Sequence, residues 1–216
     1  MKLDWKKTFF IGFGFFGISV IWQLYNSFVP IFLQAGRPDF EADVAGFGLS
    51  ATTTGVIMGL DNFAAIFILP LIGVWSDRVR TPIGRRYPFI LTAAPVAAVA
   101  FILMPIAAGM IEQSGSVAAN LPVFVLFIIG AGLMLLAMAV LRTPVISLMP
   151  DLTPSPLRSK ANGVINFMGG VGVLVATFGL SRLFDIQPII PFIAGSAILI
   201  GAVVMLFVTV REPKVY

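Results

Sequence analysis

The 216-residue sequence has no cysteine and no histidine, and only 11% of its residues are charged. These absences exclude disulfides, thiol chemistry, the common zinc sites and the Ser-His and Cys-His arrangements of hydrolytic enzymes. We therefore expect a protein that is not an enzyme and that holds no metal and no cofactor. Hydrophobic residues make up 58% of the chain, and its mean hydropathy of +1.00 excludes a water-soluble globular domain.

Apolar stretches long enough to cross a bilayer, which takes about 20 helical residues, occur six times along the chain. One of the six is interrupted by a single charge, Asp61, near its middle. The pattern predicts an all-α membrane protein in which residues 1–216 form a single six-helix transmembrane domain. The helices are expected at about 9–34, 52–75, 87–110, 121–149, 161–182 and 188–210.

Lysine and arginine are distributed unevenly between the two sides of the predicted membrane. Arg37 and Arg182 fall on one side, Arg142 lies inside the fourth helix, and the remaining eleven of the fourteen fall on the other side. These eleven are Lys2, Lys6, Lys7, Arg78, Arg80, Arg85, Arg86, Arg158, Lys160, Arg211 and Lys214. Because basic residues near span ends are retained in the cytoplasm, both termini are expected on the cytoplasmic face of the cytoplasmic membrane. The net charge of +4 resides in these short connectors and does not indicate a nucleic-acid partner.

Short matches between the two halves of the chain indicate an internal repeat. Gly-Val-Ile at 55–57, in the second helix, recurs at 163–165 in the fifth, and Pro-Phe-Ile at 88–90 recurs at 191–193. A repeat of three helices is odd in number, so its second copy must be inverted relative to the first. We predict two inverted three-helix repeats.

Two charged residues fall inside predicted spans. A carboxylate at the bilayer centre, such as Asp61, costs about 3 kcal/mol unless it is paired, hydrated or protonated. Asp61 is therefore a candidate for proton coupling in a carrier, and a structural ion pair is the alternative. Arg142 cannot lose its charge, so it would donate to substrate oxygens or neutralise Asp61, unless it reaches the cytoplasmic interface instead.

Polar side chains follow one stripe of the first helix, with Ser19, Trp22, Gln23 and Asn26 near the middle of the membrane. Polar groups cannot face lipid unsatisfied, so this stripe should face a cavity or another helix. An indole beside two carboxamides suits a sugar, whose C–H face stacks on the ring while its hydroxyls take hydrogen bonds. Asn166 in the fifth helix is a further candidate for substrate binding.

The connector after the second helix carries a distinctive pattern. Residues 73–78 read Gly-Val-Trp-Ser-Asp-Arg, 84–86 read Gly-Arg-Arg, and 87–90 read Tyr-Pro-Phe-Ile. A second pattern reads Leu-Met-Pro-Asp-Leu at 148–152 and Arg-Ser-Lys-Ala-Asn-Gly at 158–163. The first pattern resembles the signature loop of the major facilitator superfamily. Both together are similar to its sucrose and disaccharide proton-symporter branch, particularly the bacterial members.

The resemblance implies that Asp77, Arg78, Arg85 and Arg86 form a cytoplasmic latch that holds the outward-facing state. The alternative is that these arginines only orient the chain in the membrane. The sequence departs from the sucrose carriers of plants at Ile146, where those carriers have an arginine. In this sequence the arginine, Arg142, lies on the other side of the helix-four proline.

Members of the superfamily usually have twelve helices in two six-helix halves. The chain is therefore expected to act as one half of a cation-coupled, proton-driven sugar or disaccharide carrier, with lipid, the sugar and a proton or sodium ion as its partners. The second half would come from a second copy or from a missing carboxy-terminal half, and the sequence leaves both open. Export of small amphiphilic solutes and a non-transporting scaffold or sensor are the alternative functions.

Overall fold

Long apolar helices make up almost all of the protein. The structure, a computed structural model, describes residues 4–211, and within the second helix it describes the backbone but not the side chains of residues 61, 63 and 64. The helices of the described part are α1 (Trp5–Gln34), α2 (Ala51–Arg78), α3 (Tyr87–Ala108), α4 (Leu121–Leu152), α5 (Arg158–Leu174) and α6 (Ile190–Thr209). All six spans are long and apolar enough to cross a membrane, which confirms the predicted fold class.

Local signals in the sequence explain where several helices begin. The side chains of Asp4 and Ser50 accept hydrogen bonds from the backbone N–H groups of Lys7 and Thr53, and so cap α1 and α2. The bond from Lys7 lowers the pKa of the Asp4 carboxyl, which lies at the exposed start of the helix. Helices α3, α4 and α6 carry proline in the first turn, where no backbone donor is needed.

The fifth span is not a uniform α-helix. A 3₁₀ turn at Ser155–Leu157 precedes α5, and a π-helical segment at Val175–Leu180 and a second 3₁₀ turn at Ser181–Leu183 follow it. The hydroxyl of Ser181 donates to the Ala176 carbonyl over 3.0 Å, within this irregular region. The fifth span therefore continues from Ser155 to Leu183, although the hydrogen-bond register of its helix changes along the way.

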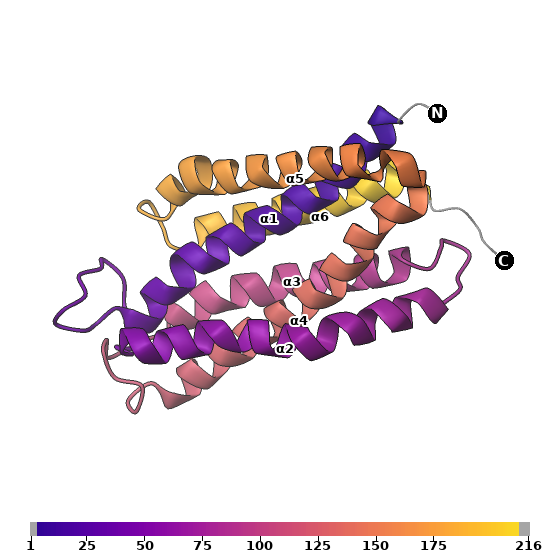
Figure 1. The fold of residues 1–216 in the computed structure, drawn as a ribbon. Coiled ribbons are helices and arrows are strands. Elements are labelled where there is room, and N and C mark those ends of the chain that lie inside the picture. Colours follow the sequence, from indigo (N-terminus) through magenta and orange to yellow (C-terminus); the bar gives the residue numbers. More distant parts are fainter. Residues whose placement is uncertain (1–3, 212–216) are drawn as a thin grey trace.

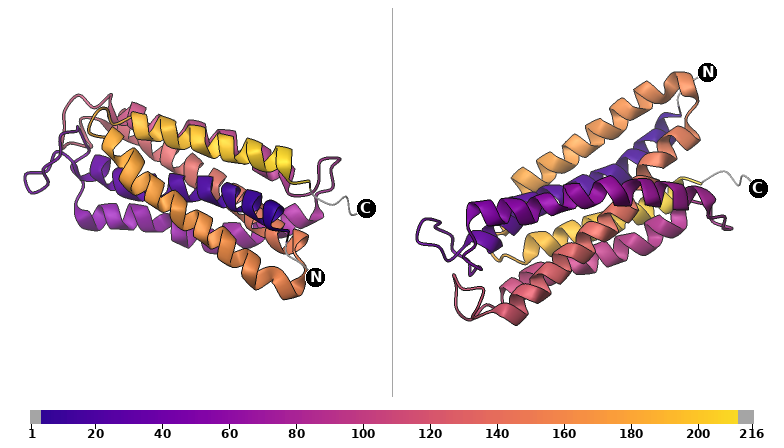
Figure 2. Two further views of the ribbon diagram at one scale, coloured as in Figure 1. Left: turned by 90° about the horizontal axis from the view of Figure 1, so that it is seen from above. Right: turned by 60° about the horizontal axis from the view of Figure 1, so that its bottom comes forward.

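The contacts between helices have the symmetry that inverted repeats require. α1 packs on α5 and α6, while α4 packs on α2 and α3. Exchanging α1 with α4, α2 with α5 and α3 with α6 turns each of these four contacts into another that is observed, and it leaves the α3–α6 and α1–α4 contacts unchanged. Figures 1 and 2 show the six helices running side by side along the bundle, with α5 lying against α1.

The connections fall at the two ends of the bundle. α1 begins and α6 ends at one end, where the α2–α3 and α4–α5 connections also lie (Figure 1). We call it the basic end, because the described residues Lys6, Lys7, Arg80, Arg85 and Arg211 belong to these segments. The other end holds the α1–α2, α3–α4 and α5–α6 connections. This arrangement is what a multi-pass membrane protein with an even number of spans requires.

At the far end, two connections are fitted tightly together. Gly36 has φ of +90° and Gly115 has φ of +84°, and a side chain at Gly36 would begin 2.3 Å from the Gly115 nitrogen. The Gly115 N–H donates to the Gly46 carbonyl over 2.8 Å, so the α1–α2 connection is bonded to the α3–α4 connection. Only glycine combines this backbone geometry with this close approach.

Glycines also allow α5 to lie directly on α1. A Cβ atom at Gly172 would lie 2.6 Å from the Phe16 carbonyl oxygen, and one at Gly169 would lie 2.8 Å from the Phe15 ring. At Gly170 a Cβ would meet nothing within 4 Å. The glycine run therefore serves close helix packing at two of its three positions.

Candidate functional site

A polar cleft lies between the membrane-spanning helices. Its volume is about 420 Å³, and its walls come from α1, α2, α4 and α5. The polar part of the lining consists of Ser19, Trp22, Gln23, Asn26, Asn62 and Arg142. Four of the five residues predicted to bind substrate are thus brought together, from helices far apart in the sequence.

The groups in this cleft leave unused hydrogen-bonding capacity. Gln23 donates from Nε2 to the Ser27 hydroxyl over 3.3 Å, and its carboxamide oxygen keeps free lone pairs. Arg142 makes no hydrogen bond or ion pair with any described residue, and Asn26 is exposed. The indole N–H of Trp22 is buried without a partner among the side chains that the structure describes, while its ring stands edge-on to Tyr25 at 5.9 Å. Donors without partners are costly in a membrane protein, so this cleft suits a ligand rich in oxygen.

A second, apolar hollow adjoins the polar cleft. It lies between α2 and α4, has a volume of about 260 Å³, and is walled by Leu60, Leu69, Gly132 and Leu136 among others. Trp22, Asn62 and Arg142 line both hollows. The two therefore meet at these three side chains.

Of the two remaining predicted site residues within the spans, the structure places Asn166 outside this arrangement. Asn166 is exposed on α5, does not line the cleft, and donates from Nδ2 to the Asn162 carbonyl of its own helix over 2.9 Å. Asp61 lies within α2, one residue before Asn62, but its side chain is outside the described part of the structure. Its predicted role in proton coupling therefore stays a prediction.

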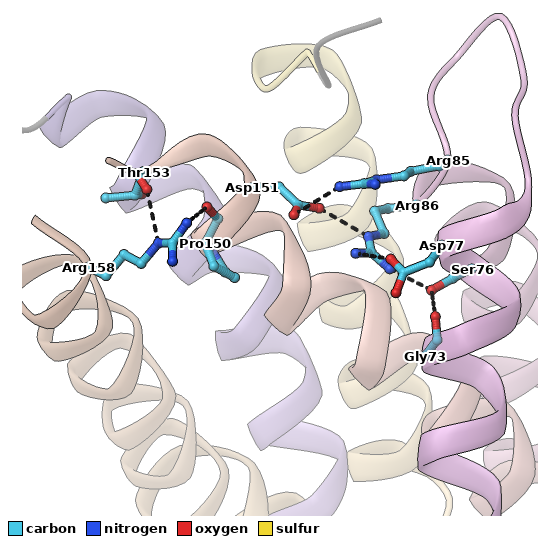
Figure 3. A network of polar contacts seen from close by, with 9 residues as sticks. All are labelled: Gly73, Ser76, Asp77, Arg85, Arg86, Pro150, Asp151, Thr153 and Arg158. Carbon is cyan, nitrogen blue, oxygen red and sulfur yellow. Dashed lines mark hydrogen bonds and ion pairs between the residues drawn. The ribbon is translucent and has the colours of Figure 1, made fainter. Parts of the chain in front are cut away.

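At the basic end, charged side chains join three helices. Arg86, at the start of α3, donates from Nε to Oδ2 of Asp151 at 3.1 Å, and its Nη2 lies 2.6 Å from Oδ1 of Asp77. Its Nη1 donates to the Ser76 hydroxyl over 2.6 Å. Figure 3 shows Arg86 between the end of α2 and the end of α4. The guanidinium thus bridges α2, α3 and α4.

The burial of this arginine makes its partners necessary. The Arg86 side chain is only 6% exposed, whereas Asp151 is 21% and Asp77 is 55% exposed. A buried charge that loses a partner costs several kcal/mol, so each carboxylate stabilises this arrangement of helix ends. Arg85 also contributes, since its Nη2 lies 3.0 Å from Oδ1 of Asp151.

The predicted latch residues do not all enter this network. Asp77, Arg85 and Arg86 do, whereas Arg78 is exposed and makes no ion pair within the described part of the chain. Asp151 was not predicted, although it lies in the Leu-Met-Pro-Asp-Leu pattern at 148–152. The sequence signal for Asp151 was that it is a single acidic residue at the end of a span, next to a basic connector.

The residue after Arg86 fastens another helix. The hydroxyl of Tyr87, which is 1% exposed, donates to the carbonyl oxygens of Leu206, at 3.3 Å, and Val210. The Leu206 carbonyl lies in the last turn of α6 and also accepts the backbone N–H of Val210 over 2.9 Å, and Val210 is the residue that caps the helix. Consecutive residues at the start of α3 therefore hold α2, α4 and α6.

Comparisons with known proteins agree with the resemblance seen in the sequence. Residues 10–216 match the family described as MFS/sugar transport protein. The chain is 25% identical to the sucrose transport protein SUC3 of Arabidopsis thaliana, covering 84% of the chain and 30% of that protein. It is 31% identical to the general alpha-glucoside permease of Schizosaccharomyces pombe, over 78% of the chain and 31% of that protein. It is 28% identical to the ectoine/proline transporter ProP of Corynebacterium glutamicum, over 88% of the chain and 33% of that protein.

The chain spans about a third of the length of these relatives, and all three have the names of transporters. The family match covers all six described spans apart from the start of α1. The chain therefore belongs to the MFS/sugar transport family of the major facilitator superfamily.

Proposed function

We propose that this chain is one six-helix half of a carrier that moves a sugar or disaccharide across the cytoplasmic membrane by alternating access, driven by a cation, most simply the proton. The observation that carries the proposal is the polar cleft, in which α1 and α4 present Trp22, Gln23, Asn26 and Arg142 together. Placing polar and charged groups inside a membrane costs free energy, and such groups typically mark the binding site of a solute that crosses it.

The chemistry of the cleft suits a polyhydroxyl ligand. The carboxamides of Gln23 and Asn26 both donate and accept, as a sugar hydroxyl does, while Arg142 offers several donors in a fixed plane. A ligand that satisfies these groups replaces the water lost when the cleft closes. At about 420 Å³, the cleft lies within the usual range for small-molecule sites.

Proton coupling is assigned to Asp61. It is the one carboxylate near the middle of α2, since Asp77 lies at the end of that helix, and the residue after Asp61, Asn62, lines the cleft. Asp61 would take up a proton from one side of the membrane and release it to the other. Its charge would then change together with the binding of substrate in the neighbouring cleft.

The network at the basic end is assigned the role of a latch. Arg86, Asp77 and Asp151 join the ends of three helices through charged hydrogen bonds, which are strong when made and are lost when the ends separate. Asp151 is added to the latch residues predicted from the sequence. Placing the basic end in the cytoplasm puts the latch and both chain termini on that side.

A second half is required to close the cleft. Its described polar groups include the exposed residues Asn26 and Arg142. In a lone bundle these groups would face lipid, where unsatisfied polar groups cost several kcal/mol each. A second copy of the chain, or a carboxy-terminal half, would cover them and provide the other wall.

A second candidate substrate class is a small zwitterion. One relative is an ectoine/proline transporter, and Arg142 has no partner among the described residues, so it is available to a carboxylate. Sugar remains the first choice because the carboxamides of α1 both donate and accept hydrogen bonds, as sugar hydroxyl groups do.

The test is substrate counter-flow in proteoliposomes preloaded with unlabelled solute. Labelled sucrose, maltose and proline should be offered separately, with a proton gradient imposed or collapsed by a protonophore. The proposal expects exchange of a sugar, and accumulation only with the gradient. Exchange of proline alone would favour the zwitterion, and the absence of any exchange by an assembly of two halves would contradict carrier function. The mass of the solubilised complex distinguishes a monomer from a pair.

A further inference from the structure

A groove at the basic end of the bundle has no part in the polar cleft. It has a volume of about 460 Å³ and lies between the α2–α3 connection, the start of α3 and the end of α6, segments that Figure 1 shows at the same end of the bundle. We call it the α3–α6 groove. Its described lining shares no residue with the polar cleft or with the hollow between α2 and α4. Transport of a solute therefore does not explain it.

The α3–α6 groove lies at the level where the bundle meets the membrane surface. Three of its apolar side chains are exposed, Ile83 at 45%, Phe207 at 38% and Val208 at 71%. Trp5, at the start of α1, and Trp75, near the end of α2, are exposed at the same end, and tryptophan is enriched at the level of the lipid headgroups. An apolar surface at this level is open to lipid.

The groove carries positive charge that the protein itself does not neutralise. Arg211 lines it, and Arg80 lies two residues before Pro82, which also lines it. Arg85 and Arg86 of the same connection are paired with carboxylates, whereas Arg80 and Arg211 are exposed and make no ion pair with any other described residue. The described lining contains no acidic side chain. Basic pockets between transmembrane helices suit anionic lipid headgroups.

We propose that the α3–α6 groove binds one phospholipid with an anionic headgroup, taken from the leaflet at the basic end. The guanidinium of Arg211 holds the phosphate, and Arg80 adds positive charge at the rim. The first part of an acyl chain lies on Phe207 and Val208.

The position of the groove favours lipid over the other possible occupants. The cleft that a second half is proposed to close has its walls on α1, α2, α4 and α5, whereas the groove is formed by α3 and α6. This step rests on the proposed pairing of two halves, which leaves the groove uncovered. A soluble phosphate compound would gain nothing from the exposed apolar side chains, because only an acyl chain removes their surface from water.

A lipid in the groove should also stabilise the end of α6. Tyr87, whose ring lines the groove, donates its hydroxyl to the carbonyl oxygens of Leu206 and Val210. A headgroup over this side chain bridges the α2–α3 connection and the end of α6, which separate when the protein unfolds. Any ligand that binds only the folded state raises its stability.

The experiment counts lipids retained by the full chain in native mass spectrometry. The protein is offered equal amounts of phosphatidylglycerol and phosphatidylcholine with identical acyl chains. The parent should retain one phosphatidylglycerol in preference to phosphatidylcholine, and Arg211→Gln should weaken binding of phosphatidylglycerol about fivefold while leaving phosphatidylcholine unchanged. Arg211→Lys keeps the charge and should recover most of the binding. Phosphatidylglycerol should raise the thermal unfolding midpoint of the parent more than that of Arg211→Gln.

Lys160→Gln is the matched control. Lys160 is exposed near the start of α5, at the same end of the bundle, and does not line the groove. This variant loses the same charge and should bind phosphatidylglycerol as the parent does. Equal midpoints of all the proteins in lipid-free detergent would show that the substitutions leave the fold intact.

Retention of phosphatidylglycerol by Arg211→Gln at the level of the parent would overturn the site. An equal loss in Lys160→Gln would also overturn it, because the lipid would then be attracted by the overall charge of the basic end. Displacement of the lipid by millimolar glycerol 3-phosphate would assign the groove to a soluble anion instead. Each of these results leaves the proposed sugar transport untouched, since the groove shares no described residue with the polar cleft.

Discussion

The Nε atom of Arg86, at the start of α3, lies 3.1 Å from Oδ2 of Asp151, near the end of α4, although 65 residues separate the two in sequence. Arg86 is almost fully buried, and its other partners are Asp77 and Ser76 of α2. The start of α3 is therefore held between the ends of two other helices. A transition that separates these helix ends must break charged hydrogen bonds.

We expect Asp151→Asn to favour the state in which the basic end is open. Loss of the carboxylate charge leaves the Arg86 guanidinium with a weaker acceptor, at a cost of about 1–3 kcal/mol after allowance for partial exposure. That cost changes the populations roughly five- to a hundredfold. Because the natural chain has no cysteine, Met58→Cys in the polar cleft is a unique reporter, and its labelling from the basic end should become faster.

The control for this prediction is Asp39→Asn. Asp39 is paired with Arg37 in the α1–α2 connection at the opposite end, and its side chain is 65% exposed. The same change of charge there should leave the labelling rate at position 58 as in the parent. Equal rates in all three proteins would mean that the arginines of the α2–α3 connection only orient the chain.

Close packing of α5 on α1 gives a prediction about stability. Gly172→Ala places a methyl group 2.6 Å from the Phe16 carbonyl oxygen, and overpacking of this kind costs about 1–3 kcal/mol. The thermal unfolding midpoint in detergent should fall by several degrees. Gly170→Ala meets no atom within 4 Å, so its midpoint should stay the same or rise through better helix propensity. Identical behaviour of the two variants would rule out the packing role.

The sequence was sufficient for the number of helices but not for the rotation of each about its axis. Apolar length alone identifies a span, since every backbone group must be satisfied within it. The polar stripe of α1 could be found because its side chains repeat at helical spacing, and the structure places Ser19, Trp22, Gln23 and Asn26 in one cleft.

Asn166 and Asp151 show what such reasoning cannot reach. Asn166 was expected to bind substrate, but in the structure its side chain donates to the Asn162 carbonyl of its own helix, an orientation that the residue pattern alone does not determine. The sequence marks Asp151 as an acidic residue beside a basic connector, but its pairing with Arg86 depends on the packing of α3 and α4, which no local pattern encodes.

The direction of insertion can be measured with two single-cysteine variants. Ser155→Cys lies at the basic end, between α4 and α5, and Gln113→Cys lies in the α3–α4 connection at the opposite end. Both positions are exposed. A membrane-impermeant maleimide should label Gln113→Cys in intact cells and Ser155→Cys only after permeabilisation, because the basic end is retained in the cytoplasm. The reverse pattern would invert the topology and move the latch to the outside.

We expect Arg142 to contribute to sugar binding through its planar set of N–H donors as well as through its charge. Arg142→Gln removes charged hydrogen bonds worth about 1.5–3 kcal/mol, and should weaken sugar binding by roughly ten- to a hundredfold. Arg142→Lys keeps the charge but loses the fork of donors, and should recover only part of the affinity. Arg80→Gln makes the same change at an exposed position outside the cleft and should bind as the parent does. Normal affinity in Arg142→Gln would mean that the guanidinium reaches the membrane surface instead of the ligand.

Asp61 distinguishes coupling from binding. If its carboxyl group carries the coupling proton, Asp61→Asn retains the shape of the side chain and, like the protonated acid, one donor and one acceptor group, but it can neither take up nor release a proton. Exchange of labelled for unlabelled sugar requires no net proton movement, so counter-flow should persist, while accumulation driven by a proton gradient should disappear. Asn62→Ser is the companion variant, because this neighbour lines the cleft but cannot titrate; it should weaken binding while the remaining uptake still follows the gradient. Gradient-driven accumulation in Asp61→Asn at the level of the parent would remove Asp61 from the coupling mechanism, and the driving ion would then have to act through another group of the complete carrier.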